Sequence, residues 1–124
     1  MYALEDNRFG NARLLLAHGA QVNVSDEEGQ TPLMDAVITG DEGIVRELLR
    51  RGARMNAHDH EGKSPLHYAV EDNNVQMAVL LLKHGAKLNA RDKQGKTPLD
   101  YATPIENEDN DGMLEMLQER GGKR

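Results

Sequence analysis

Asp59-His60-Glu61-Gly62-Lys63-Ser64-Pro65-Leu66 is the stretch that decides the fold of this 124-residue chain, because related stretches recur on both sides of it. Its Ser-Pro-Leu end returns as Thr-Pro-Leu at residues 31–33 and 97–99, so successive copies lie 33 residues apart. A fixed period of this length indicates a stack of small units that contact mainly their neighbours. Such a stack has a surface for holding other molecules and no built-in need for a catalytic centre.

Each unit is predicted to contain a turn followed by two short helices. Threonine before proline favours the start of a helix, because threonine caps helices and proline is tolerated at the first helical position. Neither helix is long enough to persist alone in water, so its apolar stripe must be covered by the next unit. The predicted boundaries in one unit are the Asp26–Gly29 turn, Thr31 and Pro32 at the start of the first helix, Gly40 at its end, Asp41 at the start of the second helix and Gly52 at its end.

Turn, Thr-Pro-Leu, short helix, glycine, second helix, Leu-Leu-x-x-Gly-Ala and asparagine together resemble the ankyrin repeat, and the resemblance covers essentially the whole chain. It implies an all-α solenoid of helix–turn–helix pairs with β-hairpin-like turns, in a right-angled stack with a concave face. Residues 26–58 and 59–91 would be full repeats. Residues 1–25 would be the second half of an N-terminal repeat, and residues 92–124 a C-terminal capping repeat with an insertion near residues 105–111.

The chain departs from the ankyrin pattern at a few positions. The family's histidine after Thr-Pro-Leu remains only as His67, with Met34 and Asp100 at the equivalent positions. We expect His67 to be a structural hydrogen-bonding residue and the turns at the other two positions to be looser. Pro104 should end the first helix of the last repeat early.

The resemblance also implies where a partner would bind, since the hairpin tips and first helices of ankyrin stacks line a concave groove that binds proteins. The tip positions expected to be exposed are Glu27, Glu28, Gln30, His60, Glu61, Lys63, Lys93, Gln94 and Lys96. The first-helix positions expected to face the groove are Asp35, Ile38, Thr39, Tyr68, Glu71, Asp72 and Tyr101, with His58 and Arg91 before the turns. We therefore expect these residues to contact a protein or peptide partner.

Charge changes along the tips, from acidic in residues 26–30 to basic in residues 92–96. We expect this order to orient a partner whose charges are arranged in the opposite sense, because complementary charge sets register and association rate. Tyr68 and Tyr101 are the candidate hot spots of the groove, since tyrosine is over-represented among such residues. The open alternative is that both tyrosines only cover helix faces.

The composition argues against several other classes of function. The formal net charge is −6 and 3% of the residues are aromatic, which disfavours nucleic-acid binding because phosphate neutralisation supplies most of that affinity. No apolar run approaches the ~18 residues of a membrane-spanning helix, so no membrane partner is expected. The chain has no cysteine and no secretion-like N-terminal segment, so we expect a cytoplasmic protein, with the nucleus as the alternative.

No residue pattern indicates catalysis, a cofactor or a metal centre. A nucleophile beside a base is not visible, so we do not expect an enzyme. His58 and His60 have no third ligand nearby in the sequence, and the acidic run at residues 106–111 lacks the spacing of an EF-hand loop.

The predicted function is therefore that of a protein-interaction module, such as a scaffold or an adaptor. The alternatives are the regulatory ankyrin segment of a larger enzyme or channel, and an engineered repeat scaffold. We expect a monomer, with self-association through the N-terminal face left open, because the half-repeat at residues 1–25 leaves that face incomplete.

Overall fold

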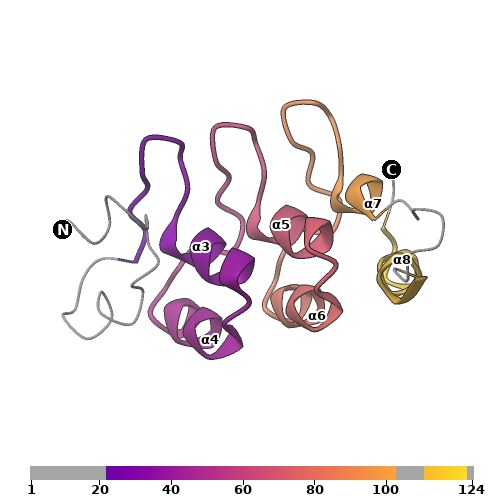
Figure 1. Ribbon diagram of the computed structural model, residues 1–124, viewed down its shortest axis with the longest axis horizontal. Coiled ribbons are helices and arrows are strands. Elements are labelled where there is room, and N and C mark those ends of the chain that lie inside the picture. Colours follow the sequence, from indigo (N-terminus) through magenta and orange to yellow (C-terminus); the bar gives the residue numbers. More distant parts are fainter. Residues whose placement is uncertain (1–21, 103–110, 123–124) are drawn as a thin grey trace.

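The structure is a computed structural model that describes residues 22–102 and 111–122, and within these ranges it contains six α-helices and no strand. The first helices of successive units are α3 (Pro32–Thr39), α5 (Pro65–Glu71) and α7 (Pro98–Tyr101). The second helices are α4 (Glu42–Arg50), α6 (Val75–Lys83) and α8 (Asp111–Glu119). Figure 1 shows the first helices in one row and the second helices in another, with a hairpin-like loop rising before each first helix. The predicted all-α solenoid of helix–turn–helix pairs is confirmed.

The first helix pair begins and ends where the local sequence predicts. The Thr31 hydroxyl accepts a backbone N–H of the first turn of α3 at 3.3 Å, and Asp41 Oδ1 accepts one from the first turn of α4 at 3.1 Å. Gly40 ends α3 with a φ of +80°, in the left-handed region that a residue with a Cβ atom rarely adopts. Gly52 follows α4 with a φ of +95°, which confirms the second predicted glycine as well.

The last unit differs from the other two in its first helix. Helix α7 has four residues, against eight in α3, and it ends at Tyr101 as the early stop predicts. The expected cause, Pro104, lies outside the described residues, as does most of the insertion expected near residues 105–111. The half-repeat expected at residues 1–25 also falls outside them up to residue 21.

Asparagine side chains join the connections at the base of neighbouring units. Asn56 Nδ2 donates to the Gly85 carbonyl at 3.1 Å, and Asn89 Nδ2 donates to the Gly121 carbonyl at 3.2 Å. The first bond spans 29 residues and the second spans 32, so Gly121 occupies the structural position of Gly85 three residues late. The stack therefore regains its phase after the insertion.

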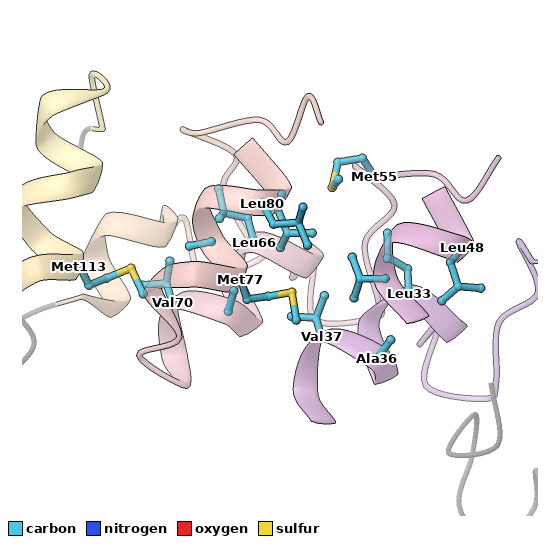
Figure 2. Packing of buried hydrophobic residues seen from close by; sticks show 14 of the residues in the cluster. Leu33, Ala36, Val37, Leu48, Met55, Leu66, Val70, Met77, Leu80 and Met113 are labelled. Atoms are coloured by element: carbon cyan, nitrogen blue, oxygen red, sulfur yellow. The ribbon is translucent and has the colours of Figure 1, made fainter. Parts of the chain in front are cut away.

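One apolar core runs through all three helix pairs. Leu48 of α4 is fully buried, and burying a side chain of this kind contributes ~1.5–3 kcal/mol. Figure 2 shows Met77 of α6 pointing toward Val37 of α3, and Met113 of α8 pointing toward Val70 of α5. The same contact thus recurs one unit later, as a repeat stack requires. Small residues that recur every 33 positions in or just after the first helices are also buried: Ala36, Ala69 and Ala102.

Backbone hydrogen bonds join adjacent hairpins at their tips. His60 N–H donates to the Glu28 carbonyl at 2.9 Å, and Lys93 N–H donates to the Glu61 carbonyl at 3.0 Å. The two bonds are one period apart, so the three tips stand in one row above the first helices (Figure 1). The three tips therefore form one continuous surface in a fixed order.

Candidate functional site

An aspartate organises each of the last two hairpins. Asp59 Oδ1 accepts the backbone N–H groups of Glu61 at 2.9 Å and Lys63 at 3.0 Å, which closes the turn. Its second oxygen, Oδ2, accepts the hydroxyl proton of Tyr68 on α5. Asp92 makes the same three contacts one unit later, with Gln94, Lys96 and Tyr101. Each of these hairpins is thus fixed to the first helix of its own unit.

The sequence predicts the turns that begin at Asp59 and Asp92 but not the bonds of these aspartates to Tyr68 and Tyr101, although a signal for those bonds was present. In both units a tyrosine follows the aspartate after nine residues. In the first unit that position is Asp35 and not a tyrosine, while Asp26 Oδ1 still closes its own turn by accepting from the Gln30 N–H at 2.9 Å.

Burial and neighbouring carboxylates determine how these groups ionise. Burial, reinforced by the hydrogen bond to Asp59, raises the pKa of the Tyr68 hydroxyl well above its usual range, and burial with Asp92 does the same to the pKa of Tyr101. Burial alone would raise the pKa of Asp92, but the Tyr101 hydroxyl and the backbone N–H groups of its hairpin outweigh burial and lower that pKa. At neutral pH both tyrosines are therefore neutral donors, and Asp92 is a charged acceptor.

Lys63 links its own unit to the next one. Its Nζ lies 2.9 Å from Glu71 Oε1, 5.5 Å from the ring centroid of Tyr68 and 5.2 Å from the ring centroid of Tyr101 in the following unit. Burial acts to lower the pKa of Lys63, but the hydrogen bond and charge of Glu71 outweigh it, so the pKa is raised. One unit earlier, Gln30 Nε2 donates to the Tyr68 hydroxyl at 3.3 Å.

His67 links the same two units from inside the stack. Its side chain is fully buried, with Nδ1 3.1 Å from the Ser64 backbone nitrogen and Nε2 3.0 Å from the Lys96 carbonyl oxygen. Because the Ser64 N–H donates to Nδ1, the proton of the neutral ring is on Nε2, which donates to Lys96. The ring of Tyr101 meets the His67 ring edge-on, with 5.7 Å between centroids. The prediction that His67 is structural is confirmed.

In the last unit Asp100 takes the place of His67 in accepting the backbone N–H three residues earlier in the chain. Its Oδ2 accepts the backbone N–H of Thr97 at 2.9 Å and the Thr97 hydroxyl at 3.2 Å. The expectation of a looser turn at this position is therefore wrong, because a carboxylate two bonds from the backbone can accept the same N–H as the histidine ring.

Most of the predicted partner-contacting residues lie at the surface. The exposed ones are Glu27, Glu28, Ile38, Thr39, His58, His60, Glu61, Glu71, Asp72, Arg91, Lys93, Gln94 and Lys96, while Asp35, Tyr68 and Tyr101 are half-buried.

Two tip positions differ from the prediction. Gln30 was expected to be exposed but is only 9% exposed, because its side chain points to Tyr68 of the next unit. Lys63 is only partly accessible, with 17% of its side chain exposed, because it lies between Tyr68, Tyr101 and Glu71. Both residues stand at the foot of a hairpin rather than at its tip, so the following unit covers them.

Comparison with known protein families agrees with this geometry. A family model described as ankyrin repeats, in three copies, matches residues 1–59 and 40–122. The chain belongs to the ankyrin repeat family. No curated protein matches the sequence. Ankyrin repeats are generally protein–protein interaction modules, and the family is typically non-catalytic.

The ankyrin hairpins of this chain carry graded charge. Residues 26–30 contain three acids, residues 59–63 contain two acids and one lysine, and residues 92–96 contain one acid and two lysines, so their formal charges are −3, −1 and +1. Because the hairpins are bonded in a row, the gradient follows the long direction of the stack (Figure 1). Ile38 on α3 adds an apolar contact point, since it is the one large hydrophobic side chain that is exposed in residues 22–102 and 111–122, at 41%.

Within the described ranges, no group of three histidine, aspartate or glutamate side chains is placed to hold a metal ion. Asp59, between His58 and His60, directs its carboxylate to its own turn and to Tyr68. None of the helices in this part of the chain is both long enough and apolar enough to cross a bilayer.

Proposed function

We propose that this ankyrin domain is a protein-binding module that acts as a scaffold or an adaptor. Its partner, another protein or a peptide, lies along the hairpin tips and the first helices α3, α5 and α7. The observation that carries the proposal is the row of bonded tips whose formal charge changes from −3 to +1. A row of this kind offers a fixed order of charge, and a complementary partner is thereby held in one register.

The rigidity of the row supports this proposal. Each tip is closed by its own aspartate and bonded to the tip beside it, so the exposed side chains start from a backbone that is already ordered. A preorganised surface loses less conformational entropy on binding than a flexible one. The same property explains how short hairpins without strands can serve as a binding surface.

Tyr68 and Tyr101 are the proposed centre of the groove. Their hydroxyl groups are occupied by Asp59 and Asp92, so each tyrosine offers a partner the accessible part of its ring rather than a free donor. Tyr68→Ala should therefore weaken partner binding, while Tyr68→Phe, which keeps the ring, should preserve most of it. Loss of binding in both variants would point to a purely structural role for Tyr68.

Site-specific photo-crosslinking in an extract of the source cells tests the proposed surface. A photoreactive side chain at Ile38 or Gln94 samples the groove and the tips, and the same group at Arg46 or Gln76 samples exposed positions on the second helices α4 and α6. We expect one protein to be captured from both groove positions and from neither control position. Its purified form should then bind the unlabelled domain. Capture of the same protein from all four positions, or only from α4 and α6, would refute the proposed surface.

A further inference from the structure

Lys96 is the counterpart of Lys63 one unit later, but its charge is not compensated in the same way. Lys63 Nζ is paired with Glu71, whereas the residue 33 positions after Glu71 is Pro104, which carries no charge. Lys96 Nζ lies 5.6 Å from the ring centroid of Tyr101 and forms no ion pair with the described residues. The ring of Tyr101 is therefore close to two ammonium groups, and within the described residues only that of Lys63 has a carboxylate partner.

Hydrogen bonds to Asp92 and His67 hold the backbone of Lys96 in place. Its backbone N–H donates to Asp92 Oδ1 at 2.9 Å, and its carbonyl accepts from the Asp92 N–H at 2.9 Å and from His67 Nε2 at 3.0 Å. The Tyr101 ring beneath the ammonium is held by its hydroxyl bond to Asp92 and by its edge contact with His67. Lys96 thus presents an exposed charge from a rigid support.

Two further cations belong to the same hairpin. Lys93 at the tip is exposed and makes no ion pair with the described part of the chain. Arg91 Nη1 donates to the Gly95 carbonyl at 2.7 Å, which holds its guanidinium against the hairpin. The one acid of this hairpin, Asp92, is buried and its carboxylate accepts from three donors of its own unit.

We propose that Lys96, over the ring of Tyr101 and beside Lys93, anchors a glutamate or aspartate side chain in an acidic segment of a partner protein. This inference rests on the proposed protein-binding function and assigns the chemistry of the partner at one end of the groove. An ammonium that packs on a ring keeps its charge while losing part of its water shell, which favours a charge-assisted hydrogen bond to a carboxylate. The opposite end, with Glu27 and Glu28 exposed, repels the same segment, so the acidic part of the partner lies at the third hairpin.

A labelled oligoglutamate peptide probes this anchor, with an oligolysine peptide of equal length as the charge-reversed probe. Titration of the isotope-labelled chain should shift the backbone amide signals of Lys93, Lys96 and Tyr101 with oligoglutamate. Lys96→Glu should weaken oligoglutamate binding by about fivefold or more, because it turns an attraction into a repulsion. Lys87→Glu is the matched control: Lys87 is exposed on the connection after α6, and this variant changes the net charge equally. It should alter the affinity by less than about twofold.

Several outcomes would overturn the anchor. Equal weakening by Lys96→Glu and Lys87→Glu would mean that only the net charge matters. Equal shifts of the same signals by inorganic phosphate would mean that any small anion binds. Sedimentation that shows concentration-dependent self-association, abolished by Lys96→Glu, would assign this surface to a second copy of the chain. In contrast, the anchor would be supported if the Lys96→Glu variant binds oligolysine more tightly than the parent chain does, with shifts in the same backbone amide signals.

The two proposals can fail separately. If oligoglutamate does not bind at Lys96 but crosslinks from Ile38 and Gln94 still capture one protein, the acidic anchor is wrong and the protein-binding function stands. If those crosslinks capture nothing specific while oligoglutamate binds at Lys96, the anchor binds acidic chains but the proposed groove is wrong.

Discussion

Gly62 and Gly95 occupy the same place in successive hairpins, but only Gly62 lies against another hairpin. Their φ angles are +79° and +80°, so an alanine would meet the same left-handed strain at both positions. A Cβ atom on Gly62 would lie 2.7 Å from the Lys93 backbone nitrogen and 3.1 Å from the Asp92 carbonyl carbon. A Cβ atom on Gly95 would meet no described atom within 4 Å. Comparing Gly62→Ala with Gly95→Ala therefore separates the cost of backbone strain from the cost of steric overlap between adjacent hairpins.

The expected magnitudes follow from these contacts. Left-handed strain costs an alanine ~1–2 kcal/mol, and the reduced freedom of the unfolded chain returns ~0.4–1 kcal/mol, so Gly95→Ala should destabilise by about 1 kcal/mol. Gly62→Ala adds an overlap with backbone atoms, which typically costs ~1–3 kcal/mol. Moving the hairpins apart to relieve it would also weaken the bond between Lys93 N–H and the Glu61 carbonyl. We therefore expect a total of about 2–4 kcal/mol for Gly62→Ala.

Urea unfolding followed by far-ultraviolet circular dichroism measures both variants under the same conditions. Gly29→Ala provides a second copy of the test, because its Cβ atom would lie 2.7 Å from His60 Cδ2 and 2.9 Å from the His60 nitrogen, with a φ of +82°. Gly29→Ala and Gly62→Ala should therefore lose more stability than Gly95→Ala. Equal losses in all three variants would refute close packing of the hairpin tips, on which the proposed binding surface depends.

Three more perturbations test the core, the buried histidine and the buried carboxylate. Leu48→Ala should cost ~2–5 kcal/mol in unfolding free energy by opening a cavity, while Glu47→Ala on the same helix should stay within ~0.5 kcal/mol; similar losses would mean that the faces of α4 are misassigned. His67→Phe should cost ~1–3 kcal/mol in urea unfolding, because it leaves the buried Ser64 N–H without its acceptor and removes one of the donors to the Lys96 carbonyl; a loss near zero would contradict the link between units. Asp92 stabilises the fold above its unfolded pKa of about 3.9 and ceases to do so as the pH falls through its lowered native pKa. Tyr101→Phe removes one donor to Asp92, so the variant should lose less stability than the parent between neutral and acidic pH; an unchanged or larger loss would argue against that hydrogen bond.

Local chemistry in the sequence determined the units of this protein and the ends of their helices. A cap such as Thr31 or Asp41, or a left-handed glycine such as Gly40, acts on backbone groups within about four residues, so its effect is visible without knowledge of the rest of the chain. The period of 33 residues then required the units to stack, because helices this short do not persist alone. The charge order of the tips was also readable, since it follows from the order of the units.

Only the tertiary structure decided which side chains a partner can reach. Gln30 and Tyr68 are 38 residues apart, as are Lys63 and Tyr101, so each of these contacts depends on the following unit. The pattern within one unit places Gln30 and Lys63 among exposed residues, but packing against the next unit covers the first and most of the second. Lys96 has the same local sequence position but is exposed, and the described ring beside it, Tyr101, belongs to its own unit. The exposure of a side chain depends on its neighbours in space. A repeat sequence fixes which unit lies next to each unit, but it does not fix how far the side chains of the neighbouring unit reach.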